Sequence, residues 1–395
     1  MLHLLYCGRM SGDAVDPSPC SRARWAEGLT RTLRPWLGLA LVCAGFSLHP
    51  KFLHTFWTRD YLPNILQQAG TNIVVAVGMT FVIMTGGIDL SVGSVMALCG
   101  VALGLATTTG VPPFIAYLAA APFGVLVATA LVRTAPGRSR REWQGLIAGV
   151  IVVIVGGLGV LSLCRGGAVL AVGVCIALGV GVSCGLINGL VITKGSVPPF
   201  VATLGMLTAA RGITVYATDG NSVSGLPPAL GHVGQGAPLV LIALLCAGVG
   251  TQLLTRTRMG RYITAIGGNE EASRLSGVNV GLYKTIAYAL SGLTAGIAAI
   301  LLTAKFRLAD TGAGANAELS AIAAVVIGGA SLSGGQASVP GSLVGALTIA
   351  VLNAGLVLVG IPDTLQGVII GAVIILTVLV DQIQKRRSGT RGGVA

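Results

Sequence analysis

A short stretch that begins at Asn269, with the sequence NEEASRLSG, gathers charged and capping residues in a chain with only 13 acidic side chains. Asn269 is a good N-cap residue, and Glu270 and Glu271 occupy the first turn, where the helix dipole favours anions. Arg274 follows these two residues at ion-pairing distances along a helix, and Gly277 can end the helix. The stretch therefore predicts a complete helix of two turns, which is marginal in water unless another surface packs against it.

A second candidate site is TGGIDLSVGS, residues 85–94, where Asp89 follows a long apolar segment. A carboxylate at the centre of a membrane helix costs about 2.5–3.5 kcal/mol on insertion scales, and is a candidate for proton or substrate binding. We favour a capping role for Asp89, because a cap satisfies backbone N–H groups that lipid cannot satisfy.

The segment GGASLSGG, residues 328–335, repeats the pattern of GGIDLSVG, residues 86–93, with Ser331 in the place of Asp89. Since Asp and Ser are both good N-caps, each copy predicts a helix that begins after a glycine break. The residues of the two predicted breaks are Gly86, Gly87, Asp89 and Ser91, and Gly328, Gly329, Ser331 and Ser333.

Residues for covalent or metal chemistry are dispersed. The eight cysteines form no C-x-x-C pair, and the four histidines (His3, His49, His54 and His232) are dispersed, with none in the interior of an apolar segment. No G-x-x-x-x-G-K-[ST] phosphate loop is present, so this chain is not itself expected to hydrolyse ATP. We therefore expect no catalytic residue, no metal site and no cofactor in this chain.

Several polar side chains fall within or near apolar segments: Asn188, Asn353, Thr203, Thr208 and Arg211. For each one, hydrogen bonding between helices is the simpler interpretation, and lining of a hydrophilic path is the alternative. The first four are our candidates for such a path.

The elements that must position these residues are membrane helices. Hydrophobic residues make up 53% of the 395-residue chain and charged residues 10%, whereas a soluble domain carries about a quarter charged residues. The formal charge of +12 comes from loops between apolar segments, with no basic domain to bind nucleic acid. The composition predicts an all-α, polytopic membrane bundle with many glycines at helix contacts.

Apolar runs near the 20 residues that a span requires predict about twelve transmembrane helices. The predicted spans are residues 35–49, 69–86, 90–109, 112–132, 145–164, 168–193, 198–217, 237–255, 281–303, 317–330, 339–359 and 365–382.

The positions of Arg and Lys indicate the orientation, because cytoplasmic loops are enriched in them. We expect a cytoplasmic segment at 1–34, a transmembrane domain at 35–384 with a cytoplasmic loop at 256–280, and a basic cytoplasmic tail at 385–395. Both termini then lie in the cytoplasm, and the loop between Thr218 and Ala237, which lacks Lys and Arg, faces outward.

Three separated blocks resemble ABC-importer permeases of the ribose/xylose/arabinose/galactoside class. They are GMTFVIMTGGIDLSVGSVMAL, RYITAIGGNEEASRLSGVNV and ELSAIAAVVIGGASLSGG, which begin at Gly78, Arg261 and Glu318. Within the second block, EASRLSG resembles the E-A-A-x-x-x-G coupling motif, with Ser273 where the second Ala is usual. By local sequence alone, this stretch would be an ordinary capped helix on the membrane surface.

The resemblance implies that residues 269–277 form a coupling helix that contacts a separate ATPase subunit, which binds ATP and Mg. The residues concerned are Asn269, Glu270, Glu271, Ala272, Ser273, Arg274 and Gly277. It also implies an extracytoplasmic sugar-binding protein, a second permease copy in a homodimer, a monosaccharide substrate and a place in the bacterial inner membrane. Nucleoside-like or autoinducer-like substrates stay open.

The chain departs from this family in one region. The family is expected to have about ten helices, whereas three spans (112–132, 145–164 and 168–193) stand here where one is expected, which implies an extra hairpin. The rival function is an ion-coupled secondary transporter. It would require several acids or histidines facing one another inside the spans, and apart from Asp89 the spans are nearly free of them.

Overall fold

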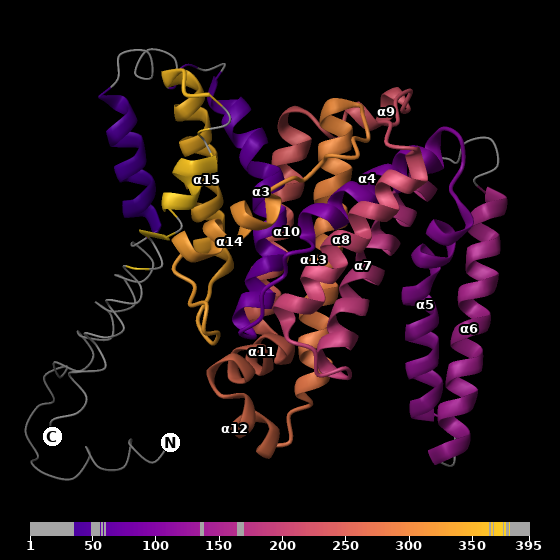
Figure 1. Cartoon of the computed structure of the whole chain (residues 1–395). Coiled ribbons are helices and arrows are strands. Elements are labelled where there is room, and N and C mark those ends of the chain that lie inside the picture. Colours follow the sequence, from indigo (N-terminus) through magenta and orange to yellow (C-terminus); the bar gives the residue numbers. More distant parts are fainter. Residues whose placement is uncertain are drawn as a thin grey trace, which may run out of the picture.

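The computed structural model describes residues 35–48, 56, 58, 61–134, 138–163 and 170–362, and residues 365, 367–373, 375–376 and 379. Within these residues the chain is helical apart from its connections and one isolated bridge between Val223 and Ala309. The helices run side by side in a bundle (Figure 1). The predicted all-α fold is confirmed. The segments predicted at 1–34 and 385–395 lie outside the described residues.

The observed helices follow most of the predicted spans. Their bounds are α3 Tyr61–Met84, α4 Val92–Thr107, α5 Pro113–Thr134, α6 Arg138–Leu163, α7 Leu170–Thr193, α8 Pro199–Thr218, α9 Pro228–Gly231, α10 Gly236–Arg256, α11 Arg258–Gly268, α12 Glu270–Leu275, α13 Val280–Phe306, α14 Ala317–Ile327 and α15 Val339–Val359. Helices α3 and α6 begin before the predicted spans that start at residues 69 and 145, at Tyr61 and Arg138. Polar residues at both starts had hidden these first turns from a search for apolar runs.

Among the described residues, six helices are long and apolar enough to cross a membrane: α3, α7, α8, α10, α13 and α15. Shorter apolar helices cover Pro35–Ser47, α4, the first part of α5, the apolar part of α6, and α14. The six long helices agree with a polytopic membrane protein.

Helix α3 lies at the centre of the bundle, where it contacts α10, α13, α14 and α15 (Figure 1). The most apolar stretch of α3 is 78% buried inside the protein, compared with 17% for that of α8 and 28% for that of α10. Residues of α3 are therefore covered by protein, and most of α8 and α10 remains free for lipid or for another protein surface.

Helices α7 and α13 pack closely through glycine. A Cβ atom added to Gly181 of α7 would lie 2.3 Å from the carbonyl oxygen of Gly292 in α13, and one added to Gly185 would lie 2.2 Å from the carbonyl oxygen of Tyr288. Because glycine has no Cβ atom, the two backbones can approach this closely, as is typical of membrane helices with small residues at their interface. The pair thus holds α13 firmly against the bundle.

The segment between α10 and α13 forms two short helices at one end of the bundle, opposite α9 (Figure 1). We did not predict α11. Thr257 caps it by accepting a hydrogen bond from the Gly260 N–H at 3.2 Å, and Ile263 and Ile266 are buried on one face. The apolar face is too short to read as a span, and the helix depends on packing against its neighbours.

Candidate functional site

Helix α12 has the local structure that its sequence predicts. The Asn269 side chain accepts a hydrogen bond from the Ala272 N–H at 2.9 Å, so Asn269 is the N-cap. Gly277 adopts a φ of +81°, and the Val278 N–H closes the end of the helix on the Ser273 carbonyl at 3.1 Å. These contacts satisfy backbone groups that a short helix would otherwise leave open.

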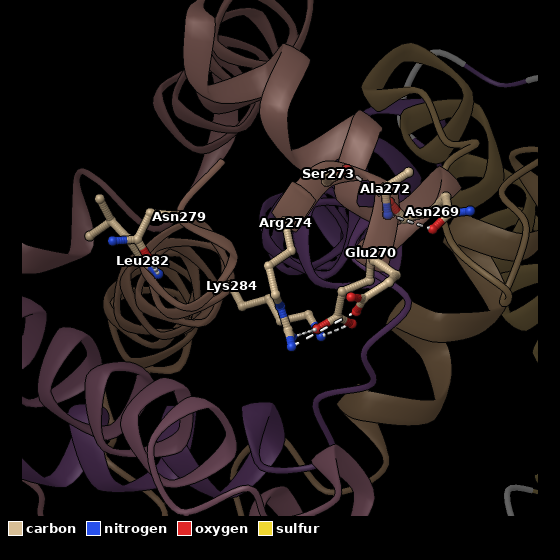
Figure 2. A network of polar contacts seen from close by, with 9 residues as sticks. Asn269, Glu270, Ala272, Ser273, Arg274, Asn279, Leu282 and Lys284 are labelled. Atoms are coloured by element: carbon tan, nitrogen blue, oxygen red, sulfur yellow. Dashed lines mark hydrogen bonds and ion pairs between the residues drawn. The ribbon is translucent and has the colours of Figure 1, made fainter. Parts of the chain in front are cut away.

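Glu270 of α12 forms ion pairs with two basic residues, Arg274 of the same helix and Lys284 of α13, as Figure 2 shows. Arg274 contacts Glu270 at 3.2 Å and Glu271 at 3.9 Å, at the spacings predicted. The closest pair joins Glu270 to Lys284 of α13 at 2.6 Å, and the Lys284 side chain is only 19% exposed. Lys284 was not among the predicted site residues, because it lies fourteen positions from Glu270 and in another helix.

The two faces of α12 differ. Ser273 is the buried residue of this helix, and its hydroxyl donates to the Asn269 carbonyl at 2.8 Å. Ala272 and Leu275 are exposed on the protein surface, and Leu275 is 81% exposed. A large apolar side chain at the tip of a charged helix is suited to a protein partner. Leu275 was not among the predicted site residues, although its position inside the motif could have indicated it.

Asp89 is buried at the break between α3 and α4, with 2% of its surface exposed. One carboxylate oxygen accepts from the Ser91 N–H at 3.0 Å and from the Ser91 hydroxyl at 2.7 Å. The other accepts from the Ser291 hydroxyl of α13 at 2.8 Å. The predicted N-cap role is corrected: the cap position of α4 is Ser91, and Asp89 holds that residue and α13 instead. Its geometry is an Asx-type turn beside a contact between helices.

The prediction for Ser331 is also wrong. No helix begins there; α15 begins at Val339, and its N-cap is Ser338, which accepts from the Gly341 N–H at 3.1 Å. The Ser331 hydroxyl accepts from the Ser333 N–H at 3.3 Å within a turn, and Ser333 is exposed. Positive φ angles at Gly334 and Gly335, +88° and +75°, prevent a helix from starting in this turn.

The glycines of both breaks are closely packed or left-handed. Gly86 and Gly329 adopt φ angles of +78° and +90°, which favour glycine. A Cβ added to Gly87 would lie 2.4 Å from the Tyr288 hydroxyl, and one added to Gly328 would lie 2.5 Å from the backbone of Gly341. Each predicted break is therefore real, although only the first leads directly into a helix.

The four candidate path residues have different surroundings. The Asn188 side chain donates to the Ser91 hydroxyl at 2.9 Å, so it joins α7 to the Asp89 network. Thr203 is buried and donates to the Pro199 carbonyl at 2.9 Å; Thr208 is exposed and donates to the Gly205 carbonyl at 2.9 Å. The Asn353 side-chain oxygen is buried and has no hydrogen-bond partner among the residues that the structure describes. Asn188 thus forms a hydrogen bond between helical segments, whereas a role in lining a path stays a prediction for all four residues.

Two further charged residues lie near this network. Arg211 of α8 donates to the carbonyls of Thr311 and Ala313. Glu318, in the first turn of α14, is partly buried, and a Cβ added to Gly93 would lie 2.4 Å from its carboxylate. Glu318 was not among the predicted site residues, because it stands at the edge of a predicted span. Within the part of the chain that the structure describes, no three His, Cys, Asp or Glu side chains form a metal-binding group.

Comparison with known proteins matches residues 61–135 and 145–378 to the family described as branched-chain amino acid transport system / permease component. Between these two parts the match omits residues 136–144, which include the first residues of α6. No solved structure matches the chain.

The chain is similar to the ribose import permease proteins of Escherichia coli (strain K12) and Bacillus subtilis (strain 168), with 37% identity to each. These alignments cover 87% and 90% of this chain and 91% and 94% of the two relatives. It is also 35% identical to the galactofuranose transporter permease protein of Escherichia coli (strain K12), over 95% of both chains.

Proposed function

The chain belongs to the branched-chain amino acid transport system / permease component family, and from this premise we propose that it imports a monosaccharide as the membrane-spanning subunit of an ATP-driven transporter. The observation that carries the proposal is the 37% identity to ribose import permeases over nearly their whole length. The chain provides a route through the membrane and makes or breaks no covalent bond.

The energy for transport comes from a separate ATPase subunit that docks on α12. Two observations support this assignment: the sequence contains no phosphate loop, and α12 presents the exposed side chains of Ala272 and Leu275 beside Glu271. Glu271, Ala272, Ser273 and Gly277 form the coupling motif, and Asn269, Glu270 and Arg274 shape it. ATP and Mg bind to that partner.

A sugar-binding protein delivers the substrate at the opposite end of the bundle. There the connection from α8 to α10 pairs with the connection after α13, through the Val223–Ala309 bridge and through the Ser222 hydroxyl, which donates to Asp310 at 3.1 Å. This end has a folded surface that suits a large partner. The α12 end then faces the cytoplasm of a bacterial inner membrane, and both termini lie on that side.

The working unit is a homodimer. The low burial of α8 and α10 supports this proposal, because each leaves a wide surface open on a single copy of the chain. Exposed Gly205 and Thr208 on α8 would allow close approach of another helix.

An amino acid substrate is the second candidate, because the family description names branched-chain amino acids. The sugar is favoured, since the relatives that align over most of both chains are named for ribose, galactofuranose, D-allose and xylose.

Uptake by a strain that lacks this gene tests both candidates. We expect uptake of one radiolabelled pentose or hexose to fall at least about tenfold and to return when the gene is restored, while leucine uptake is unchanged. The reverse result would support the amino acid. In the restored strain, depletion of ATP should abolish uptake, whereas an uncoupler added with ATP maintained should not. Uptake that follows the ion gradient would contradict an ATP-driven importer.

A further inference from the structure

The bond between Glu270 and Lys284 distinguishes the two acidic residues of α12. Glu270 contacts Lys284 at 2.6 Å, at a position where the lysine is 19% exposed. Glu271, 69% exposed, contacts only Arg274 at 3.9 Å among the ion pairs of the described residues. A short, charge-assisted hydrogen bond at a partly buried lysine fixes geometry far better than a long, exposed pair. Helix α12 is therefore attached to α13 through Glu270 (Figure 2).

Three polar side chains follow one face of α13. Lys284, Tyr288 and Ser291 are spaced by four and three residues, which places them in one row along the helix. The Tyr288 hydroxyl donates to the Ile88 carbonyl at 3.4 Å, and the Ser291 hydroxyl donates to Asp89 at 2.8 Å. The row spans about 10 Å along the axis. It runs from the coupling helix to the break between α3 and α4.

The far end of this row is a closed polar network. Asp89 binds both the backbone and the hydroxyl of Ser91, and Asn188 of α7 donates to the same hydroxyl. Each member is buried, so the loss of one partner would leave a polar group unpaired in a dry interior. A shift of Ser291 must therefore move Asp89 and the start of α4, or break the network.

We propose that Lys284, Tyr288 and Ser291 are positioning residues that carry movement of α12 along α13 to the break at Asp89. The proposal rests on the function proposed above. Helix α13 is continuous from Val280 to Phe306, so a push on its first turns moves Ser291 with them. Lys284 receives the movement, and Ser291 delivers it to the carboxylate.

Transport coupling in proteoliposomes tests this proposal. The chain is reconstituted with its ATPase and binding protein, and the molecules taken up per ATP hydrolysed are measured. We expect Lys284→Gln, Ser291→Ala and Tyr288→Phe each to lower this ratio, by at least about fivefold for the first two. Tyr288→Phe keeps the buried ring and removes one hydroxyl, so it remains informative if another variant folds poorly.

Control variants separate coupling from general damage. Lys194→Gln makes the same change at an exposed lysine that directly follows α7. This lysine lies near the first turns of α13, because the hydroxyls of its neighbour Thr193 and of Thr285 in α13 are 3.2 Å apart. It should leave the ratio unchanged, and Lys284→Arg should restore most of it. The double variant of Lys284→Gln and Ser291→Ala should have a ratio no lower than that of the more impaired single variant, because both residues act in the same chain of contacts.

The outcomes distinguish the two proposals. If the wild-type assembly shows no ATP-dependent uptake, the proposed function is wrong. If the wild type transports and the three variants keep its ratio, the function stands and the role of α13 is wrong. The role of α13 is also wrong if the ATPase no longer co-purifies with Lys284→Gln. It is equally wrong if the losses of the two single variants multiply in the double variant.

Discussion

The two glycine breaks of the molecule have similar sequences and different structures. Helix α3 ends with Gly86 left-handed and the Gly87 N–H bonded to the Val82 carbonyl at 3.1 Å. Helix α14 ends in the same way, with Gly329 left-handed and the Ala330 N–H bonded to the Val325 carbonyl at 3.1 Å. Both helices thus stop by the same backbone motif.

After the stop, the two segments diverge. Val92 stands where the second copy has Gly334, and α4 begins at Val92, whereas Gly334 adopts a φ of +88° and continues the turn. The first break is closed by the Asp89 side chain, which joins two other helices through Ser291 and Ser91.

The second break is closed by its backbone. The Ser331 N–H bonds the Gln336 carbonyl at 2.8 Å, and the Gly335 N–H bonds the Met84 carbonyl at 3.0 Å. A buried carboxylate requires several hydrogen-bond donors, and here one of them comes from another helix, whereas the Ser331 hydroxyl accepts a hydrogen bond within its own turn. The first break is thus tied to α7 and α13 through side chains, whereas the second is tied to α3 through its backbone.

Asp89→Ala should have the largest effect on stability. It leaves the hydroxyls of Ser91 and Ser291 and one backbone N–H without their acceptor, so we expect a loss of about 3 kcal/mol or more. Thermal unfolding in detergent can be followed with a thiol-reactive dye, because Cys99 and Cys184 are buried. Asp89→Asn, which keeps one acceptor, should lose less. Equal stability of Asp89→Ala and the wild type would remove the distinction between the breaks.

Gly267→Ala should have an intermediate effect, because both breaks meet at this residue of α11. An added Cβ would lie 1.8 Å from the Met84 carbonyl and 2.3 Å from the Gly335 N–H. We expect a loss of about 1–3 kcal/mol from overpacking. Gly268→Ala is the matched control, since nothing lies within 4 Å of its Cβ position, and it should change stability by less than about 0.5 kcal/mol. Similar midpoints for the two variants would refute the close contact.

Ser331→Ala should have the smallest effect. It removes the 3.3 Å hydrogen bond that the Ser333 N–H donates within the turn, for an expected loss of about 1 kcal/mol or less. The same unfolding assay measures this change beside Asp89→Ala. A loss as large as that of Asp89→Ala would show that the second break also relies on its polar side chain.

Local features of the site were predictable because their physics lies within a few residues. The caps of α12 at Asn269 and Gly277 and the pairs of Arg274 involve neighbours within four or five positions. The stops at Gly86 and Gly329 also follow from local glycine patterns. Helix α11 and the cap at Ser338 were missed, because their signals are short and stand beside stronger ones.

The sequence by itself determined that the chain is a helical membrane protein, where most of its helices run, and that a capped, charged helix interrupts the apolar pattern. These properties follow from composition and from contacts close in sequence. Only the tertiary structure decided that Lys284 binds Glu270, that Ser291 and Asn188 reach the Asp89 network, and that α15 begins at Val339. The physical reason is that a buried polar group takes whichever partner the packing of distant helices brings to it.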